Sequence, residues 1–212
     1  MSDGEVGNNV VSHARPDSAP GDVVVGDDGR ARCRWAASDA EYQRYHDEEW
    51  GTPLHGDRAL FEKLCLEGFQ AGLSWITILR KRPVFREVFH GFEPERVAAM
   101  DDDEIEAAMD NEGIIRNRAK ILATIKNAQV TLELTSGHPG ALDELMWSFA
   151  PDPRPPRPAS MSELPAVTAE STELSKALRK LGYGFVGPTT MYALMQSSGM
   201  VDDHLEGCWK AS

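Results

Sequence analysis

A carboxylate set among apolar residues is the first feature of this sequence that could carry chemistry. Glu67 falls on the same helical line as Leu60, Leu64 and Ala71, so a helix through this segment turns it toward the apolar side. An unmatched polar group in such a place costs roughly a few kcal/mol. The spacing therefore predicts that Glu67 faces a pocket or a buried partner. On this segment alone, a solvated glutamate at the edge of a core helix is the alternative.

Aromatic residues gather on both sides of this carboxylate. Tyr42, Tyr45 and Trp50 lie within nine positions upstream, and Trp75 follows shortly downstream. Because aromatic residues form only 8% of the chain, two groups around one carboxylate predict a pocket that stacks a flat ring. Leu73 stands between the two helical segments as an apolar tip, where a glycine breaks the first one.

Two pairs of possible metal ligands stand at opposite ends of the chain. Cys33 and His46 form the first pair, and His204 and Cys208 form the second, whose i, i+4 spacing would place both on one face of a helix. Two thiolates and two imidazoles are a donor set of structural zinc, and four protein ligands leave no position for a reactive water. Spacing alone does not settle the site, because Cys33 and His46 are not a short pair.

A glycine-rich segment near the C-terminus has two interpretations. Gly182-x-Gly184-x-x-Gly187 follows the dinucleotide-binding pattern, but that pattern needs a preceding strand, and a helical periodicity precedes this one. The glycines instead permit a tight turn between two helices, with free N–H groups beside the helix N-terminus at Thr189. Such a turn can bind a phosphate. An ordinary glycine-rich turn is the alternative.

The elements that must position these residues are predicted to be helices. No alternating strand pattern and no internal repeat is present, so the sequence predicts an all-α protein. Residues 1–31 lack helical periodicity and are predicted to be a disordered tail, followed by a single domain over residues 32–212. The proline-rich segment 151–158 predicts an exposed connector. Helices are expected at 57–71, 74–81, 83–90, 101–110, 117–134, 141–149, 172–181 and 189–198.

Composition bounds the possible functions of the chain. No apolar run approaches the ~20 residues of a membrane span, no signal-peptide pattern opens the chain, and three cysteines make no disulfide framework. We therefore expect a cytoplasmic protein, and a monomer. The net charge of −12 argues against nucleic-acid binding in general. Basic residues nevertheless cluster at 80–86, 116–120 and 176–180, and a local patch rather than the net charge sets a DNA footprint.

Taken together, the motifs resemble the 3-methyladenine DNA glycosylase I family of the helix-hairpin-helix superfamily. The resemblance spans about residues 32–209 and keeps the order of the family motifs. It rests on these segments: Tyr42-x2-Tyr45-His46-Asp-x2-Trp50-Gly51, Cys65-Leu-Glu67-Gly-x-Gln-Ala-Gly-Leu-Ser-Trp75, Gly113-Ile-Ile-Arg116, Met146-Trp147-Ser148-Phe149, Leu174-Ser-Lys-Ala-Leu178 and Gly184-Phe-Val-Gly187-x-Thr189.

The resemblance implies a fold, an activity and a metal. It implies a helix-hairpin-helix glycosylase-like fold, and hydrolysis of the N-glycosidic bond of 3-methyladenine in alkylated duplex DNA, the first step of base excision repair. It also implies one structural zinc that joins the two ends of the domain. The implied zinc ligands are Cys33, His46, His204 and Cys208.

The resemblance also implies roles for the pocket and hairpin residues. Methylation at N3 makes adenine cationic and a good leaving group, so extraction and recognition of the base are the larger tasks. Glu67 would accept a hydrogen bond from the N6 amino group, and whether it also activates water stays open. Leu73 would fill the gap left by the flipped nucleotide. The base-binding walls would be Tyr42, Tyr45, Trp50 and Trp75, with the hairpin contacts at Gly182, Gly184, Gly187 and Thr189.

Free 3-methyladenine is then expected as a product ligand. The chain departs from the wider superfamily, most of whose members carry an Asp beyond the hairpin, because Gln196-Ser197-Ser198 stands there instead. This agrees with the 3-methyladenine-specific family and with a recognition role for Glu67. Two alternatives remain. A non-enzymatic zinc-stabilised helix-hairpin-helix DNA-binding protein would keep the hairpin and the zinc ligands, and a zinc hydrolase would need an open metal position.

Overall fold

The computed structural model describes residues 21–210 and is mostly helical. A hairpin of β1 (Val23–Val25) and β2 (Ala31–Cys33) precedes the helices. Three short 3-10 helices lie at Arg34–Ser38, His90–Phe92 and Met161–Glu163. The α-helices are α1 (Ala40–Glu48), α2 (Asp57–Gln70), α3 (Trp75–Val88), α4 (Pro94–Ala98), α5 (Asp102–Asp110), α6 (Arg118–Thr135), α7 (Ala141–Trp147), α8 (Ala169–Leu181) and α9 (Pro188–Ser197).

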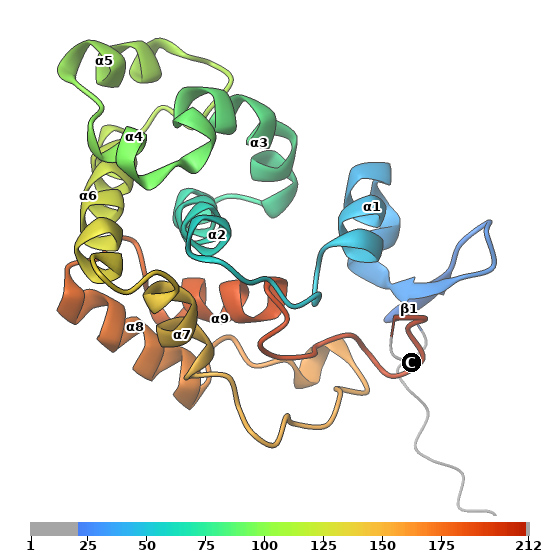
Figure 1. The fold of residues 1–212 in the computed structure, drawn as a ribbon. Helices are drawn as coiled ribbons and strands as arrows, with labels where there is room; N and C mark the ends of the chain where they lie inside the picture. The colour runs from blue at the N-terminus through green and yellow to red at the C-terminus, as the bar shows by residue number, and fades with distance from the viewer. Residues whose placement is uncertain (1–20, 211–212) are drawn as a thin grey trace, which may run out of the picture.

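The helix α2 forms the centre of the molecule. Its residues from Leu60 to Phe69 are almost all buried, on every side of the helix, which is the pattern of a helix enclosed by others. It contacts α3, α6, α7 and α9. Figure 1 shows α2 between a group made of α3 to α6 and a second group made of α7 to α9, with α1 and the hairpin to one side. A side chain from α2 can therefore reach a pocket between elements distant in sequence.

Most predicted helices are confirmed, with one boundary error and two omissions. The predicted break at Pro83 is wrong, because α3 continues through it with Ile78, Leu79 and Phe85 all packed into the core. The free energy gained by burying these side chains offsets the loss of the backbone hydrogen bond that the proline removes. The predicted helices omit α1 and the short α4. Asp39 caps α1 by accepting hydrogen bonds from the first-turn amides.

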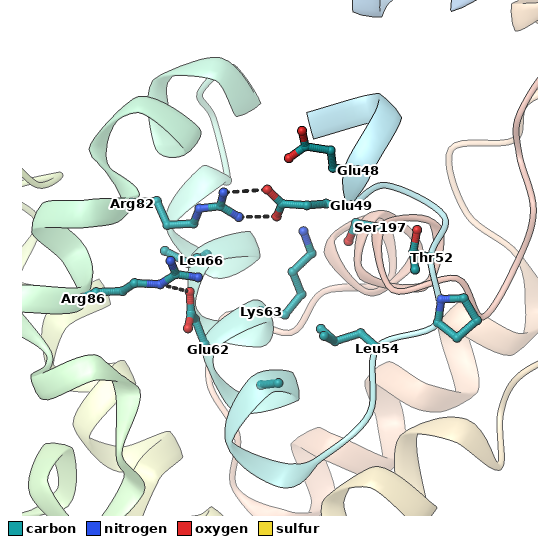
Figure 2. Close-up of a pocket in the computed structure, with 12 residues that line it drawn as sticks. Glu48, Glu49, Thr52, Leu54, Glu62, Lys63, Leu66, Arg82, Arg86 and Ser197 are labelled. Carbon is teal, nitrogen blue, oxygen red and sulfur yellow. Dashed lines mark hydrogen bonds and ion pairs between the residues drawn. The ribbon is translucent and has the colours of Figure 1, made fainter. Parts of the chain in front are cut away.

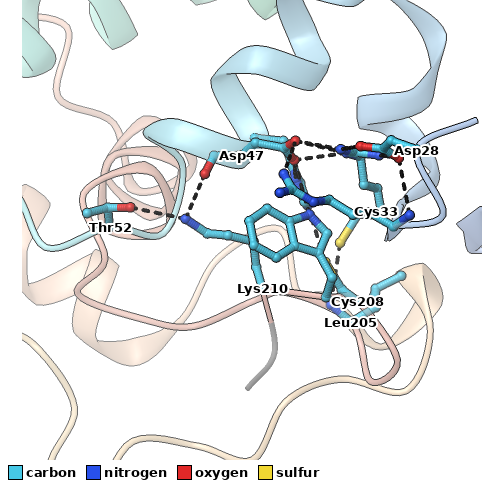
Figure 3. A network of polar contacts seen from close by, with 11 residues as sticks. Asp28, Cys33, Asp47, Thr52, Leu205, Cys208 and Lys210 are labelled. Carbon is cyan, nitrogen blue, oxygen red and sulfur yellow. Dashed lines mark hydrogen bonds and ion pairs between the residues drawn. The ribbon is translucent and has the colours of Figure 1, made fainter. Parts of the chain in front are cut away.

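The predicted disordered tail is wrong for residues 21–31, and the all-α class needs a small correction. Val23 pairs with Cys33 in an antiparallel hairpin, and the backbone amide of Trp209 donates to Ala31 O at 2.7 Å. Arg32, which is 2% exposed, bonds to Asp28 and Asp47 and ties the hairpin to α1 (Figure 3). Strands of three residues are too short to show a period in the sequence. The rest of the predicted tail, residues 1–20, lies outside the described residues.

The predicted connector is confirmed as irregular. Residues 151–158 contain no helix or strand and lead into the 3-10 helix at Met161–Glu163. Among residues 21–210, none of the helices combines the length and the apolar character that crossing a membrane requires.

Candidate active site

Glu67 is the buried carboxylate that the sequence predicts. It is 3% exposed on α2, where Ser197 of α9 donates a hydrogen bond to its Oε1 at 3.0 Å. The Nζ of Lys63, one turn earlier, lies 3.5 Å from the same oxygen. Burial raises the pKa of Glu67, and the charge of Lys63 and the hydroxyl of Ser197 oppose that rise. The solvated-edge alternative is therefore wrong.

A cavity of about 250 Å³ opens beside this carboxylate and has aromatic walls. The lining includes all four aromatic residues that the sequence predicts, and it adds a fifth, Trp35. The full lining is Trp35, Tyr42, Tyr45, Trp50, Glu67, Gln70, Trp75, Met161, Leu164, Ala193, Gln196 and Ser197. The cavity has the chemical character to hold a flat, polar-edged ring against one negative charge.

Trp35 is the pocket residue that sequence reasoning missed. Its ring packs edge-on to Tyr42 at 5.5 Å and to Trp50 at 5.1 Å between centroids. It lies in the 3-10 helix directly after β2, so the hairpin positions it. Its place two residues after Cys33 and seven before Tyr42 is the signal that could have found it.

The two tyrosines of α1 hold the pocket together through their hydroxyl groups. Tyr42 accepts a hydrogen bond from the amide of Ile76 at 2.9 Å, which ties α1 to the first turn of α3. Tyr45 accepts one from Lys63 at 2.8 Å. Burial and the nearby Glu67 carboxylate raise the pKa of Tyr45, so it stays a neutral phenol. These contacts form the pocket walls without a ligand.

Leu73 lies outside the cavity lining, on the short loop between α2 and α3. Its side chain is 41% exposed, as an apolar tip requires. Lys120 braces the loop from beneath, because its Nζ donates to Phe69 O and Ala71 O at 2.8 Å each. Phe185 of the glycine-rich turn is also exposed, at 40%, and its ring lies 5.8 Å from the Lys120 Nζ.

The glycine-rich segment forms the predicted turn between two helices, α8 and α9. Gly182 ends α8 with φ +105°, and Gly187 precedes Pro188, the first residue of α9. The amide of Gly184 donates to the Asn127 side chain at 2.7 Å, and that of Gly182 to Arg179 O. Within residues 21–210 the amides of Gly187 and Thr189 have no acceptor. Because a helix precedes the segment, the dinucleotide interpretation is excluded.

Three of the four residues of the predicted zinc set come together beside the pocket, and the fourth, His204, lies next to His46. Cys33, His46 and Cys208 are buried, and their donor atoms lie within 4.8 Å of one another. The ring of His204 lies 5.2 Å from that of His46, between centroids. His204 and Cys208 do not share a helical face, because residues 202–210 form turns and irregular chain.

The histidine contacts fit a metal. The Nδ1 of His46 bonds to Asp47 at 2.9 Å, and the Nδ1 of His204 bonds to Asp202 at 2.9 Å. Carboxylates in this place fix the ring and leave Nε2 for a metal. The Nε2 of His204 is buried and has no hydrogen-bond partner in the described part of the chain. A hydrogen bond from Cys33 lowers the pKa of the Cys208 thiol, which favours the thiolate that binds metals.

These features define a helical protein with an aromatic pocket around a buried carboxylate. A sequence model described as methyladenine glycosylase matches residues 35–211. The chain belongs to the methyladenine glycosylase family.

Two curated relatives match the chain over nearly their whole length. DNA-3-methyladenine glycosylase 1 of Escherichia coli (strain K12) is 46% identical over 178 residues, 84% of this chain and 95% of the relative. DNA-3-methyladenine glycosylase of Haemophilus influenzae is 47% identical over 178 residues, 84% of this chain and 96% of the relative.

Solved structures share the fold. A crystal structure of 3-methyladenine DNA glycosylase I is 47% identical, with a TM-score of 0.79, and covers 84% of this chain and 98% of its own. A structure of 3-methyladenine DNA glycosylase I from Staphylococcus aureus, which describes the structural basis of 3-methyladenine recognition, is 36% identical with a TM-score of 0.78. The match covers 82% of this chain and 93% of that chain. A variant of a 3-methyladenine DNA glycosylase I in complex with 3-methyladenine is 34% identical with a TM-score of 0.79, over 85% and 97%.

Proposed function

We propose that this protein is a DNA-3-methyladenine glycosylase, which flips 3-methyladenine out of alkylated duplex DNA and hydrolyses its N-glycosidic bond. The observation that carries the proposal is the buried Glu67 carboxylate in an aromatic cavity of about 250 Å³. Relatives of that name, 46% and 47% identical over nearly their full length, support it. The reaction starts base excision repair.

The pocket selects the base by charge and by shape. The cationic ring of an N3-methylated adenine gains about 0.5–2 kcal/mol over an aromatic face, and Tyr42, Tyr45, Trp50 and Trp75 supply such faces. Glu67 accepts a hydrogen bond from the N6 amino group, strengthened by its charge. Trp35 packs behind two of these rings and fixes their orientation. Because the alkylated base is already a good leaving group, recognition is the main task of these residues.

DNA is held outside the pocket. Leu73 fills the space of the flipped nucleotide, because it is the exposed apolar residue of the loop after the helix that carries Glu67. The free amides of Gly187 and Thr189, at the N-terminus of α9, bind a backbone phosphate. Gly182 and Gly184 shape the turn instead, since their own amides are used within the protein.

Zinc is structural in this proposal. Cys33, His46, His204 and Cys208 would hold it, and their histidines present the Nε2 atoms that a metal requires. With four protein ligands the metal supplies stability rather than a reactive water. It would tie β2 and α1 to the C-terminal segment, and α1 carries Tyr42 and Tyr45 of the aromatic pocket.

The proposed partner is duplex DNA, with free 3-methyladenine as the product ligand, in a monomeric cytoplasmic enzyme. The three cysteines, all within the described residues, form no disulfide, as a reducing compartment requires.

The test is base release from duplex DNA treated with a methylating agent, with the freed bases separated and identified. We expect 3-methyladenine in the supernatant and intact abasic DNA. Tight binding to methylated duplex without base release would favour the non-enzymatic DNA-binding alternative. Release that is lost when the metal is exchanged, but with the fold retained, would favour a zinc hydrolase.

A further inference from the structure

An amine lies beside the carboxylate of the pocket that is proposed to bind a cationic base. Lys63 is 8% exposed, and its Nζ lies 3.5 Å from Glu67 Oε1 and 2.8 Å from the Tyr45 hydroxyl. The same nitrogen lies 4.3 Å from the centroid of the Trp75 ring and 5.0 Å from that of Tyr45. The ammonium therefore already makes the two interactions, with a carboxylate and with aromatic faces, that a cationic base would make.

This burial needs an explanation, because it is costly. Removing an ammonium from water costs several kcal/mol unless partners compensate, and burial lowers the pKa of Lys63. The chain has a second buried lysine, Lys120, which donates to two backbone carbonyls at the end of α2 and so has a capping role. Lys63 contacts no helix end. Its only ion-pair partner among residues 21–210 is Glu67.

The other charged groups around Lys63 are paired with each other. Arg82 of α3 holds Glu49, after α1, through two hydrogen bonds, and Arg86 of α3 bonds to Glu62 at 2.7 Å. These pairs line a second cavity of about 250 Å³, which the Lys63 stem and Ser197 also line. Figure 2 shows the ammonium of Lys63 directed toward the side where Glu49 and Ser197 lie.

We propose that Lys63 is a positioning residue, which keeps Glu67 ionised and oriented in the empty pocket until a cationic base takes over as its counter-ion. This inference rests on the proposed function. The carboxylate has one neutral donor, Ser197, and one positive partner, Lys63. Without that partner, a carboxylate in so buried a place takes up a proton and can no longer meet a cationic base as an anion.

The proposal predicts a difference between the free and the bound enzyme. In the free enzyme, loss of Lys63 raises the pKa of Glu67. As the pH is lowered, the variant therefore loses excision activity at a higher pH than the wild-type enzyme does. In the complex, the cationic base itself holds the carboxylate ionised. The pH dependence of kcat/KM reports the free enzyme and that of kcat reports the complex. We therefore expect the acid limb of kcat/KM to move and that of kcat to move much less.

The experiment replaces Lys63 with Met, which keeps the length and removes the charge. Excision from methylated duplex is measured from pH 5 to 9 at limiting and at saturating enzyme. We expect the midpoint of the acid limb of kcat/KM to rise by about one pH unit or more. Each unit corresponds to a tenfold change in the protonation equilibrium. The matched control is Lys120→Met, which removes an equally buried amine outside the pocket and should leave that midpoint in place.

Two outcomes would overturn the proposal: an unmoved midpoint in Lys63→Met, or an equal shift in Lys120→Met. A second measurement tests the proposal if Lys63→Met folds poorly. Lys63→Gln keeps a donor without the charge, and the Glu67 carboxyl is titrated by carbon NMR in both proteins. That titration needs no turnover, so it tests Lys63 even if the wild-type protein releases no base. An unchanged Glu67 midpoint there would also overturn the proposal.

Discussion

The aromatic pocket and the cysteine–histidine cluster share α1, where Tyr45 faces the pocket and the next residue, His46, faces the cluster. In the pocket, the hydroxyls of Tyr42 and Tyr45 and the Glu67 carboxylate all have partners. Two buried side-chain nitrogens of the described chain have no hydrogen-bond partner: Nε1 of Trp75, which lines the pocket, and Nε2 of His204, beside the cluster. The difference is that most polar groups of the pocket pair within the protein, whereas the cluster brings together the side-chain atoms that bind metals. Substitutions in the pocket should change activity, and those in the cluster should change stability.

The largest effect is expected in the cluster. We expect about one zinc per purified chain, and we expect Cys33→Ser combined with His204→Ala to abolish zinc binding and lower the melting temperature strongly. Structural zinc contributes an apparent free energy of about 10–16 kcal/mol in small zinc domains, and a large part of that is folding free energy. Elemental analysis and thermal melting measure both quantities. Protein without zinc, or a double variant that retains it, would contradict the zinc proposal.

The next effect is expected in the pocket. Glu67→Gln keeps the shape and one acceptor oxygen but removes the negative charge. Loss of one charge-assisted hydrogen bond costs about 1.5–3 kcal/mol, so excision of 3-methyladenine should fall roughly ten- to two-hundred-fold. The affinity for undamaged duplex should change little, and the melting temperature should fall because buried Lys63 loses its charged partner.

Binding of free 3-methyladenine separates recognition from water activation by Glu67. It should weaken in Glu67→Gln together with excision. Unchanged affinity with abolished turnover would make Glu67 a general base instead.

Truncation at the N-terminus tests how far the cluster depends on the hairpin. Removal of residues 1–30 deletes β1 and the Asp28 partner of buried Arg32, so unfolding free energy should fall by about 1–3 kcal/mol. The matched control is removal of residues 1–20, which leaves the hairpin whole and should leave excision unchanged. Denaturant melts and excision rates give the comparison. Equal stability of the two truncated proteins would show that the hairpin contributes nothing.

The smallest effects separate shape from phosphate contact in the turn. Gly182 has φ +105°, so Gly182→Ala should cost about 1 kcal/mol of stability. Gly187 has φ −64°, so an alanine there meets no backbone strain, but its methyl group stands beside the proposed phosphate site. Gly187→Ala should weaken duplex binding a few-fold at fixed salt with an unchanged melting temperature. Normal binding by this variant would contradict the phosphate site.

The sequence predicted the central helices and the carboxylate of the pocket because buried apolar residues recur at helical spacing. Glu67 stood out against Leu60 and Leu64, and α5 begins close to the predicted residue 101, where Asp101 and Glu104 form a capping box. The four aromatic residues were found because they were dense in sequence. Trp35 was missed because it stands outside the dense aromatic group at residues 42–50, and its contact with Tyr42 and Trp50 depends on the turn after β2.

The remaining errors have a common cause, which is tertiary contact overriding local preference. Pro83 was predicted to separate two helices, but the core packing of α3 carries the helix through it. The hairpin at residues 23–33 was missed because three-residue strands have no period and are held by Arg32 and the C-terminal segment. Lys63 was overlooked because a lysine four residues before a glutamate is ordinarily a surface pair, and only the fold shows that both are buried.

The adjacency of Tyr45 and His46 restricts how this protein can change in evolution. A helix of nine residues serves two sites at once, and successive side chains point to different ones. A substitution that shifts α1 so that the pocket accepts a different base also displaces His46 from the cluster. Conversely, a substitution that moves His46 also moves Tyr45, which is part of the pocket wall. Lesion specificity therefore has little freedom to drift through α1. New preferences would arise more readily in α9 or the 3-10 helix at Met161–Glu163, which line the same cavity without supplying a ligand.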